Sequence, residues 1–283
     1  GCGRLEGLAR PMKALIFGLA APFLLGQGGL FPPKSPHASI SQWVGPTEVK
    51  VAFNRPAVRN RPIWGALVPY GQVWRLGANE ATTLSFSDDV KVEGHAVPKG
   101  SYALFAIPGP DRWTFILNRR SKQLGAWEYD PRLDVLRFDA KPKAAPFTEW
   151  LTFEVYPASA DGAYVDLYWE KLRVSFLVEV DVDGIVQGRM KRALASNGHD
   201  WKLLCDAAEY CLERERQMAQ AREWIEASIR IQRNPHNLLI KARILDELGQ
   251  GSQAMATLQE ALQVGQKQKA PRTLLGPVEE TLR

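Results

Sequence analysis

Cysteine is scarce in this chain, with three residues in 283. Cys2 lies in the N-terminal segment, whereas Cys205 and Cys211 lie six positions apart in a stretch with helical periodicity. Six residues of helix rise by about 9 Å, which is beyond the reach of a disulfide bond. We therefore expect these two cysteines to be small buried apolar residues. A fold without disulfides neither supports nor excludes a location outside the cytoplasm.

Motifs for metal binding, phosphate binding and hydrolysis are missing as well. The histidines are far apart and form no His-x-His or His-Glu-x-x-His spacing. The sequence contains no Gly-x-Ser-x-Gly turn and no glycine-rich phosphate loop. We therefore expect neither a metal centre nor a cofactor. The four histidines are His37, His95, His199 and His236.

No long stretch carries charge of one sign. The formal net charge of +5 falls to about +3 if an N-terminal segment with Arg4, Arg10, Lys13 and the acidic Glu6 is removed. From Val182 onward, 15 Lys and Arg residues are interspersed with 13 Asp and Glu residues. Binding of nucleic acid needs a concentrated basic face, so we expect no nucleic-acid partner.

Hydrophobic runs long enough to span a membrane are also absent. The apolar run Ala14–Gly26 has 13 residues, follows Lys13 and ends in small residues. This length is typical of a secretory signal and too short for a spanning helix. We expect a signal peptide at about Met12–Gly28, with Met12 as the start, a periplasmic or extracellular location, and no stable membrane anchor after the leader (residues 1–28) is removed. The alternative is a buried hydrophobic N-terminal helix.

Alternating apolar residues dominate the stretch from Ala38 to Val180, with turn signals every 8–12 residues or so. Ten strands without interleaved helices predict an antiparallel two-sheet β-sandwich of jelly-roll type at residues 38–181, after a linker at 29–37. The predicted strands are Ala38–Val44, Glu48–Phe53, Thr82–Ser87, Val90–Glu93, Tyr102–Ile107, Trp113–Leu117, Asp134–Phe138, Glu149–Tyr156, Tyr164–Trp169 and Arg173–Val180.

An internal repeat follows, where the hydrophobic period changes to 3.6 residues. Small residues at helix-crossing positions and Gly249 in a turn match the tetratricopeptide pattern, which predicts a small tetratricopeptide-like domain at 182–267 and a tail at 268–283. Two repeats are fewer than the three usually needed, so we expect Ile185–Ser196 to cap them or the helices to dock on the sandwich. Leu204, Ala208, Cys211, Trp224 and Ala227 recur 34 residues later as Leu238, Ala242, Leu245, Leu258 and Ala261.

Several motifs in the first half of the chain carry a family resemblance. They include Ser35-Pro36-His37-Ala38-Ser39, Arg55-Pro56, Leu67-Val68-Pro69-Tyr70-Gly71 and Trp74-Arg75-Leu76-Gly77-Ala78-Asn79-Glu80-Ala81-Thr82. On these residues, 35–180 resembles the bacterial family catalogued as domain of unknown function 2911. The resemblance implies a secreted β-sandwich and no assigned reaction. Leu76 stands where the family usually has threonine.

The Trp74–Glu80 block is the best candidate site, because loops on a rigid scaffold often display binding groups. Arg75 could pair with Glu80 or present its fork to a carboxylate or phosphate, and Asn79 offers the donors and acceptors that polyol recognition requires. The alternative is a loop that only satisfies its own backbone. The candidate ligand-binding residues are Arg55, Trp74, Arg75, Asn79, Glu80, His37 and Trp127.

Aromatic residues are plentiful, with nine Trp and seven Tyr. Trp43, Trp150 and Trp169 lie inside predicted strands, where we expect core packing. Loop aromatics are better candidates for stacking on a sugar ring. They are Trp64, Trp127 and Tyr129.

These patterns favour a non-enzymatic binding protein. The sandwich would take a polar small molecule or glycan, and the helical repeats would recruit a protein or peptide partner. One alternative is a cell-envelope hydrolase acting on carbohydrate or peptide, which would need two of Glu80, Glu149 and Glu170 to lie about 5–9.5 Å apart. Another is a purely structural role.

Overall fold

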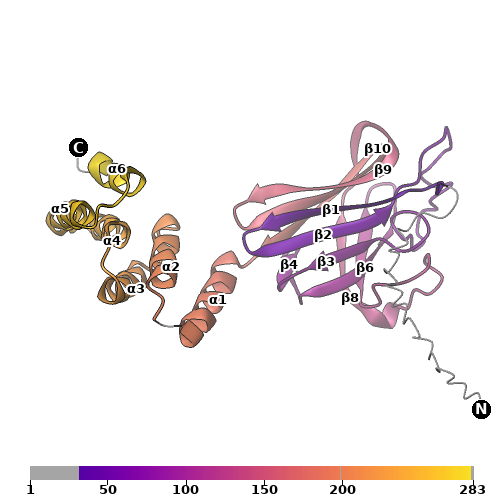
Figure 1. Cartoon of the computed structure of the whole chain (residues 1–283). Helices are drawn as coiled ribbons and strands as arrows, with labels where there is room; N and C mark the ends of the chain where they lie inside the picture. Colours follow the sequence, from indigo (N-terminus) through magenta and orange to yellow (C-terminus); the bar gives the residue numbers. More distant parts are fainter. Residues whose placement is uncertain (1–31, 198, 282–283) are drawn as a thin grey trace, which may run out of the picture.

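A β-unit is followed by a row of helices in the computed structural model, which describes residues 32–197 and 199–281 (Figure 1). The expected signal peptide lies outside the described residues. Within them, no helix is long and apolar enough to cross a membrane. The predicted order, an antiparallel β part and then helices, is confirmed.

Two antiparallel sheets form the β-unit. The six-stranded sheet has the order β1-β2-β3-β6-β7-β8, and the four-stranded sheet has the order β5-β4-β10-β9. The strands are β1 (His37–Val44), β2 (Thr47–Asn54), β3 (Thr83–Phe86), β4 (Val90–Val92), β5 (His95–Val97), β6 (Gly100–Ile107), β7 (Trp113–Asn118), β8 (Asp134–Ala140), β9 (Lys143–Ser159) and β10 (Gly162–Val180), with one short 3-10 helix at Pro131–Leu133.

One hydrophobic core is shared by the two sheets. Val49, Val51 and Phe53 on alternate positions of β2 are buried, and so are Val174 and Phe176 on β10. The period of two places the residues between them on the outer face of each sheet. On the six-stranded sheet this outer face carries a second, smaller cluster around Phe105 and Ile116, covered by the loop that follows β7.

Two predicted strands, Tyr164–Trp169 and Arg173–Val180, are one strand in the structure. The polar Glu170 and Lys171 between them resemble a break, but Glu170 adopts a left-handed φ of 56° and the ladder with β9 shifts register there. A bulge of this kind bends a strand without ending it. The short strand β5 was missed, because three residues carry too little periodicity.

Core packing was wrongly predicted for two tryptophans. Trp43 is 59% exposed and Trp150 is 39% exposed, whereas Trp169 is buried as expected. Both exposed rings lie on the outward-facing side of their strands. Alternate residues of a strand point to opposite faces of the sheet, so lying in a strand does not by itself predict burial.

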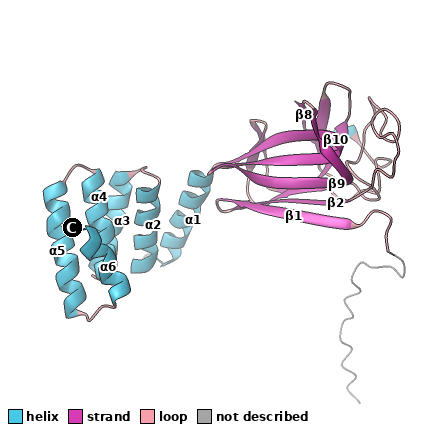
Figure 2. Cartoon of the chain, turned by 90° about the horizontal axis from the view of Figure 1, so that it is seen from above, coloured by secondary structure: helices cyan, strands magenta, loops and turns pink. Residues whose placement is uncertain are grey.

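Six helices follow the β-unit in the described residues; the first five lie one after another away from it in Figure 2, and the last lies back against the fourth and fifth. Residues 268–283 were expected to be a tail, but α6 lies there and buries Val278 against the helices before it. Cys205 and Cys211 are buried free cysteines, as expected. The helices are α1 (Val182–Asn197), α2 (Trp201–Glu213), α3 (Met218–Ile231), α4 (Pro235–Glu247), α5 (Gly251–Lys267) and α6 (Arg272–Thr281).

The predicted repeat corresponds to the helix pairs α2–α3 and α4–α5. Asp200 caps α2 through the amides of Lys202 and Leu203, and Asn234 caps α4 34 residues later. The turn after each first helix closes alike: the amide of Glu215 donates to the carbonyl of Leu212, and the amide of Gly249 donates to that of Asp246. The two turns therefore share one backbone geometry.

Candidate ligand-binding site

The connection from Trp74 to Thr82 is a closed loop at one end of the β-unit. At its base, the amide of Thr82 donates to the carbonyl of Arg75 over 3.1 Å, and the Thr82 hydroxyl donates to the carbonyl of Leu76 over 2.8 Å. Trp74 exchanges two backbone hydrogen bonds with Ala106 on β6. These bonds hold the loop rigidly, which suits a site that must keep its shape.

Inside the loop, two residues other than glycine adopt left-handed backbone conformations. Leu76 has a φ of 55° and is fully buried, while Asn79 has a φ of 58° and is exposed. Asparagine tolerates this region better than most residues. The carbonyl of Asn79 accepts the amide of Gly125, so the neighbouring loop fixes the orientation of Asn79.

Two pockets lie on either side of this loop. The Glu80 pocket, of about 660 Å³, takes in three of the predicted residues, His37, Asn79 and Glu80. The Arg75 pocket, of about 290 Å³, takes in Trp74 and Arg75. The predicted set is therefore divided between two adjacent cavities, and only Ser35 lines both.

Arg55 and Trp127 line neither pocket. Arg55 donates from Nε to the carbonyl of Leu151 and from Nη2 to the hydroxyl of Thr152, at 3.0 and 2.6 Å. Its guanidinium therefore connects the end of β2 to β9. Trp127 is 83% exposed on the loop after β7.

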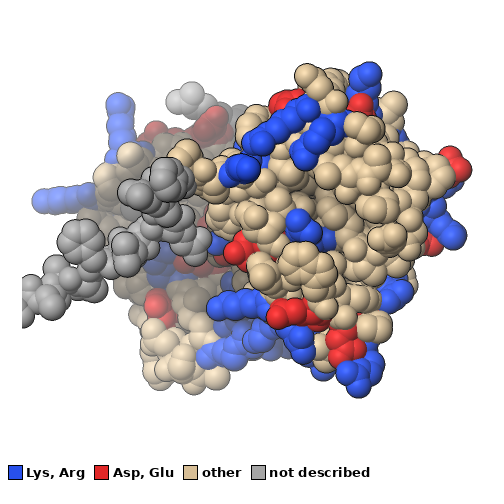
Figure 3. Space-filling model, turned by 90° about the vertical axis from the view of Figure 1, so that its right-hand side faces the viewer, with Lys and Arg blue, Asp and Glu red and all other residues tan. Residues whose placement is uncertain are grey.

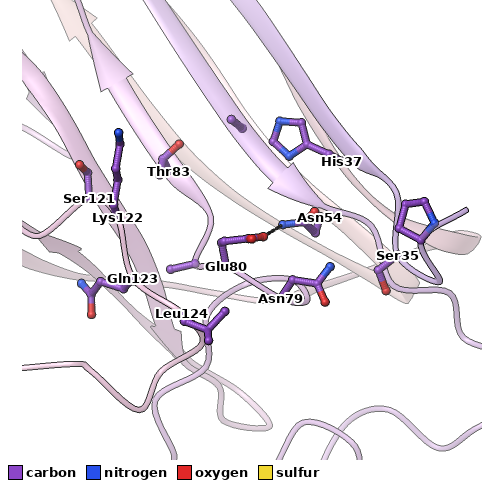
Figure 4. A pocket seen from close by; sticks show the side chains of 13 residues that line it. Ser35, His37, Asn54, Asn79, Glu80, Thr83, Ser121, Lys122, Gln123 and Leu124 are labelled. Atoms are coloured by element: carbon purple, nitrogen blue, oxygen red, sulfur yellow. Dashed lines mark hydrogen bonds between the residues drawn. The ribbon is translucent and has the colours of Figure 1, made fainter. Parts of the chain in front are cut away.

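The floor of the Glu80 pocket is the outer face of the six-stranded sheet. His37, Ala52 and Thr83 point outward from β1, β2 and β3, and the loop Ser121–Leu124 forms one wall. The side chains of Asn54 and Glu80 point toward each other, and Asn54 Nδ2 donates to Glu80 Oε2 over 2.9 Å (Figure 4). The second carboxylate oxygen of Glu80 makes no hydrogen bond to a described residue.

The Arg75 pocket has a different character. Its wall includes Trp74 and Trp169, whose rings stack with centroids 5.9 Å apart, and both belong to the buried core. Trp64, expected as a loop aromatic for ligands, packs edge-on against both rings instead. The remaining lining residues are Lys34, Ser35, Pro56, Ala57, Arg59, Arg61, Leu67, Val68, Arg75, Gly77 and Ala78.

Several residues that line the two pockets were not predicted from the sequence. Asn54 ends β2 just before Arg55-Pro56, and Thr83 alternates with the buried Leu84, so both positions carried a usable signal. Ser121 to Leu124 carried none, because only the packing of a distant loop on the sheet brings them to Asn79. Arg59 and Arg61 lie close to the Arg55-Pro56 motif and were not singled out.

Catalytic arrangements find little support in the described part of the chain. Glu80 is the one carboxylate that lines its pocket. Glu149 accepts a hydrogen bond from the amide of Arg59, and Glu170 accepts one from the amide of Lys171. Neither glutamate lines the Glu80 pocket. Among the described residues, no group of three or more His, Cys, Asp or Glu side chains could hold a metal ion.

The β-unit is therefore an antiparallel β-domain of two sheets, with a hydrogen-bonded loop and two adjacent pockets. The chain belongs to the family described as Protein of unknown function (DUF2911), which matches residues 35–178. Comparison with curated proteins and with solved structures gave no match. The match covers the β-unit and ends before the helices.

Proposed function

We propose that this protein is a non-enzymatic binding protein whose β-unit holds a polyhydroxylated ligand, such as a glycan, in the Glu80 pocket. In this proposal the two sheets form a jelly-roll-like sandwich and the helices form a tetratricopeptide-like unit. The apolar segment Ala14–Gly26 would direct the chain to the periplasm or the cell exterior.

One observation carries the proposal: polar side chains without partners among the described residues gather around an open pocket. The imidazole of His37, the amide of Asn79 and the hydroxyl of Thr83 make no side-chain hydrogen bond there, nor do Ser35 and Ser121. These side chains are exposed or half-buried, so their hydrogen-bonding groups are free to bond to water or to a ligand. A mixture of donors and acceptors facing one space is what a polyol needs.

Apolar surface in the same pocket supports a sugar over a simple ion. Ala52 and Ala81 form part of its lining, and Leu124 is an exposed apolar residue on its rim. A sugar ring presents hydroxyl groups at its edge and C–H groups on its faces, so it matches a pocket with both kinds of surface.

The hydrolase alternative is less well supported by the geometry. Glycoside hydrolysis requires two carboxyl groups flanking the scissile bond. Glu80 has no second carboxylate in its pocket, and its nearest polar partner is the neutral amide of Asn54. The arrangement is suited to hold a ligand rather than to transfer a proton to it and activate water.

For the helical unit we propose a protein or peptide partner. A cavity of about 410 Å³ lies where α4 begins, lined by Trp201, Pro235, His236 and Pro271 among others. Paired helices of this kind commonly present extended surfaces to partners.

An array of neutral and acidic oligosaccharides tests the proposed function. We expect the full chain to bind a subset of them, and Asn79→Gly and Glu80→Gln each to weaken binding about tenfold, the loss of one or two hydrogen bonds. Glycine keeps the left-handed backbone at position 79 comfortable, and glutamine can still accept from Asn54, so folding should be preserved.

His95→Ala is the matched control, because His95 is an exposed histidine on β5, outside the pocket. It should leave binding unchanged, whereas His37→Ala should weaken it. A chain that binds no oligosaccharide, or variants that bind as well as the native chain, would contradict the proposal.

A further inference from the structure

We propose that the Arg75 pocket is an oxyanion site, a second binding site separate from the Glu80 pocket, which takes a carboxylate or phosphate group. The proposal rests on the charge of its lining, on the environment of Arg75 and on the shape of the cavity.

The lining carries positive charge without any carboxylate. Four cationic residues line the pocket, and none of them forms a salt bridge within the described residues. The surrounding surface is mixed, because Asp and Glu side chains lie among the Lys and Arg side chains on this end of the molecule (Figure 3). The excess is therefore a property of the pocket. The four residues are Lys34, Arg59, Arg61 and Arg75.

Other arginines in the β-unit have clear hydrogen-bond or ion-pair partners. Arg173 pairs with the buried carboxylate of Asp166, with Nε and Oδ2 2.7 Å apart. Arg61 donates from Nε to the carbonyl of Val58 and from Nη2 to that of Ala57, at 3.0 and 2.6 Å. The guanidinium groups of these arginines thus donate to backbone carbonyls or to carboxylates, as arginines generally do.

Arg75 does neither. Its side chain is half-buried, its Nε has no accessible surface, and the guanidinium makes no hydrogen bond to any described residue. Burial removes water from this guanidinium and thereby lowers its pKa. A charge removed from water without a partner is costly, so an anion bound here would recover energy that the empty site forgoes.

The Arg75 pocket has room for a small anionic group together with some of its water. At about 290 Å³ it is less than half the volume of the Glu80 pocket. Gly77 and Ala78 add no bulky side chain to the lining, and the stacked rings of Trp74 and Trp169 form an apolar wall. An apolar wall reduces the local dielectric screening, which strengthens the attraction between a guanidinium and an oxyanion.

Calorimetric titration of the full chain with sodium phosphate and, separately, with sodium succinate tests this site, with sodium chloride at equal ionic strength as the blank. We expect at least one oxyanion to bind, and the affinity to fall as salt is added. Preference for phosphate or for succinate distinguishes a tetrahedral from a planar ligand group.

Arg75→Gln should weaken oxyanion binding at least tenfold, and Arg75→Lys should weaken it less, because lysine keeps the charge but loses the fork. Arg112→Gln is the control: it removes one positive charge at an exposed position that pairs with Asp139, outside the pocket. Arg59→Gln, at an exposed position of the lining, should weaken binding several-fold and keeps the test open if Arg75→Gln folds poorly.

Stability separates a ligand site from a brace. An uncompensated charge should not stabilise the ligand-free fold, so Arg75→Gln should unfold at the same temperature as the native chain or higher, and only the native chain should gain stability from the oxyanion. A lower unfolding temperature of Arg75→Gln with unchanged binding, or no binding of either anion to the native chain, overturns the proposal. Asn79→Gly should keep oxyanion binding, because Asn79 lines only the Glu80 pocket. The experiment therefore distinguishes failure of the oxyanion proposal from failure of the glycan proposal.

Discussion

At the scale of single residues, the Trp74–Glu80 loop depends on one close approach. A Cβ atom at Gly77 would lie 2.8 Å from the carbonyl oxygen of Asn54, which is backbone and cannot rotate away. Asn54 in turn donates to Glu80. The glycine therefore sets the distance between the loop and the end of β2, and with it the position of a carboxylate in the pocket.

Gly77→Ala should reduce the free energy of unfolding by about 1–3 kcal/mol, because backbone must shift to relieve the overlap. Denaturant unfolding measures the change. Gly251→Ala is the control, since no atom lies within 4 Å of its added Cβ and alanine favours the helix there. Equal stability of Gly77→Ala and the native chain would show that the loop is loosely packed.

The residues that the motif singled out lie at cavities, and their role in binding a ligand stays a prediction. Asn79, Glu80 and His37 do line one cavity, and Trp74 and Arg75 line another. The sequence could not show that the residues of the Trp74–Glu80 block line two separate cavities. That division depends on the side of the loop toward which each side chain points. Arg55 was predicted to bind a ligand, but its side chain donates a hydrogen bond to the backbone of β9. The sequence alone does not distinguish an arginine that binds a ligand from one that binds the protein backbone.

At the scale of elements, the two helix pairs differ in how well their turns suit the backbone. Gly249 has a φ of 72° after α4, and Glu215, 34 residues earlier, is forced to a φ of 51° after α2. Glu215 is exposed and makes no side-chain hydrogen bond to a described residue. A β-carbon in this region is strained, whereas glycine is not.

Glu215→Gly should therefore stabilise the helical unit by about 0.5–1 kcal/mol, and Gly249→Ala should destabilise it by about 1 kcal/mol. Thermal unfolding followed by circular dichroism at 222 nm detects both changes. The opposite signs at equivalent positions are the test. If Glu215→Gly destabilises the chain, the equivalence of the two turns is wrong.

Prediction of the strands failed where a bulge or the short length of a strand hid the alternation of apolar and polar residues. The bulge at Glu170 interrupts the alternation of β10, although pairing with β9 continues past it. The helices were easier, because Asp200 and the repeated apolar positions supplied both a start signal and a register.

At the scale of the whole molecule, the helices meet the β-unit through charged side chains as well as apolar contact. Val182 at the start of α1 is buried in the β-unit core. Arg214 pairs with Asp161 at the turn between β9 and β10, with 2.7 Å between Nη2 and Oδ1. Asp183 accepts the hydroxyl of Tyr210 over 2.8 Å and pairs with Arg214 and Arg216.

This junction should weaken in acid. The hydrogen bond from Tyr210, together with the two arginines, lowers the pKa of Asp183. A carboxyl group whose folded pKa is depressed stabilises the fold above its unfolded value of about 4, and the contribution is lost as the pH falls through the folded value. Asp183→Asn should therefore lower stability at neutral pH and flatten its dependence on pH below about 4.

Denaturant unfolding at stepped pH provides the measurement. Asp139→Asn, which removes an exposed carboxylate paired with Arg112, is the control and should change the curve little. An unchanged acid limb in Asp183→Asn would show that the junction is held by its apolar contacts alone.

We propose above that the Trp74–Glu80 loop holds a ligand and does not merely brace the β-unit. The most direct measurement is the oligosaccharide affinity of Asn79→Gly taken together with its free energy of unfolding. We expect native stability with affinity reduced about tenfold. Reduced stability with native affinity would contradict it and assign the loop a structural role.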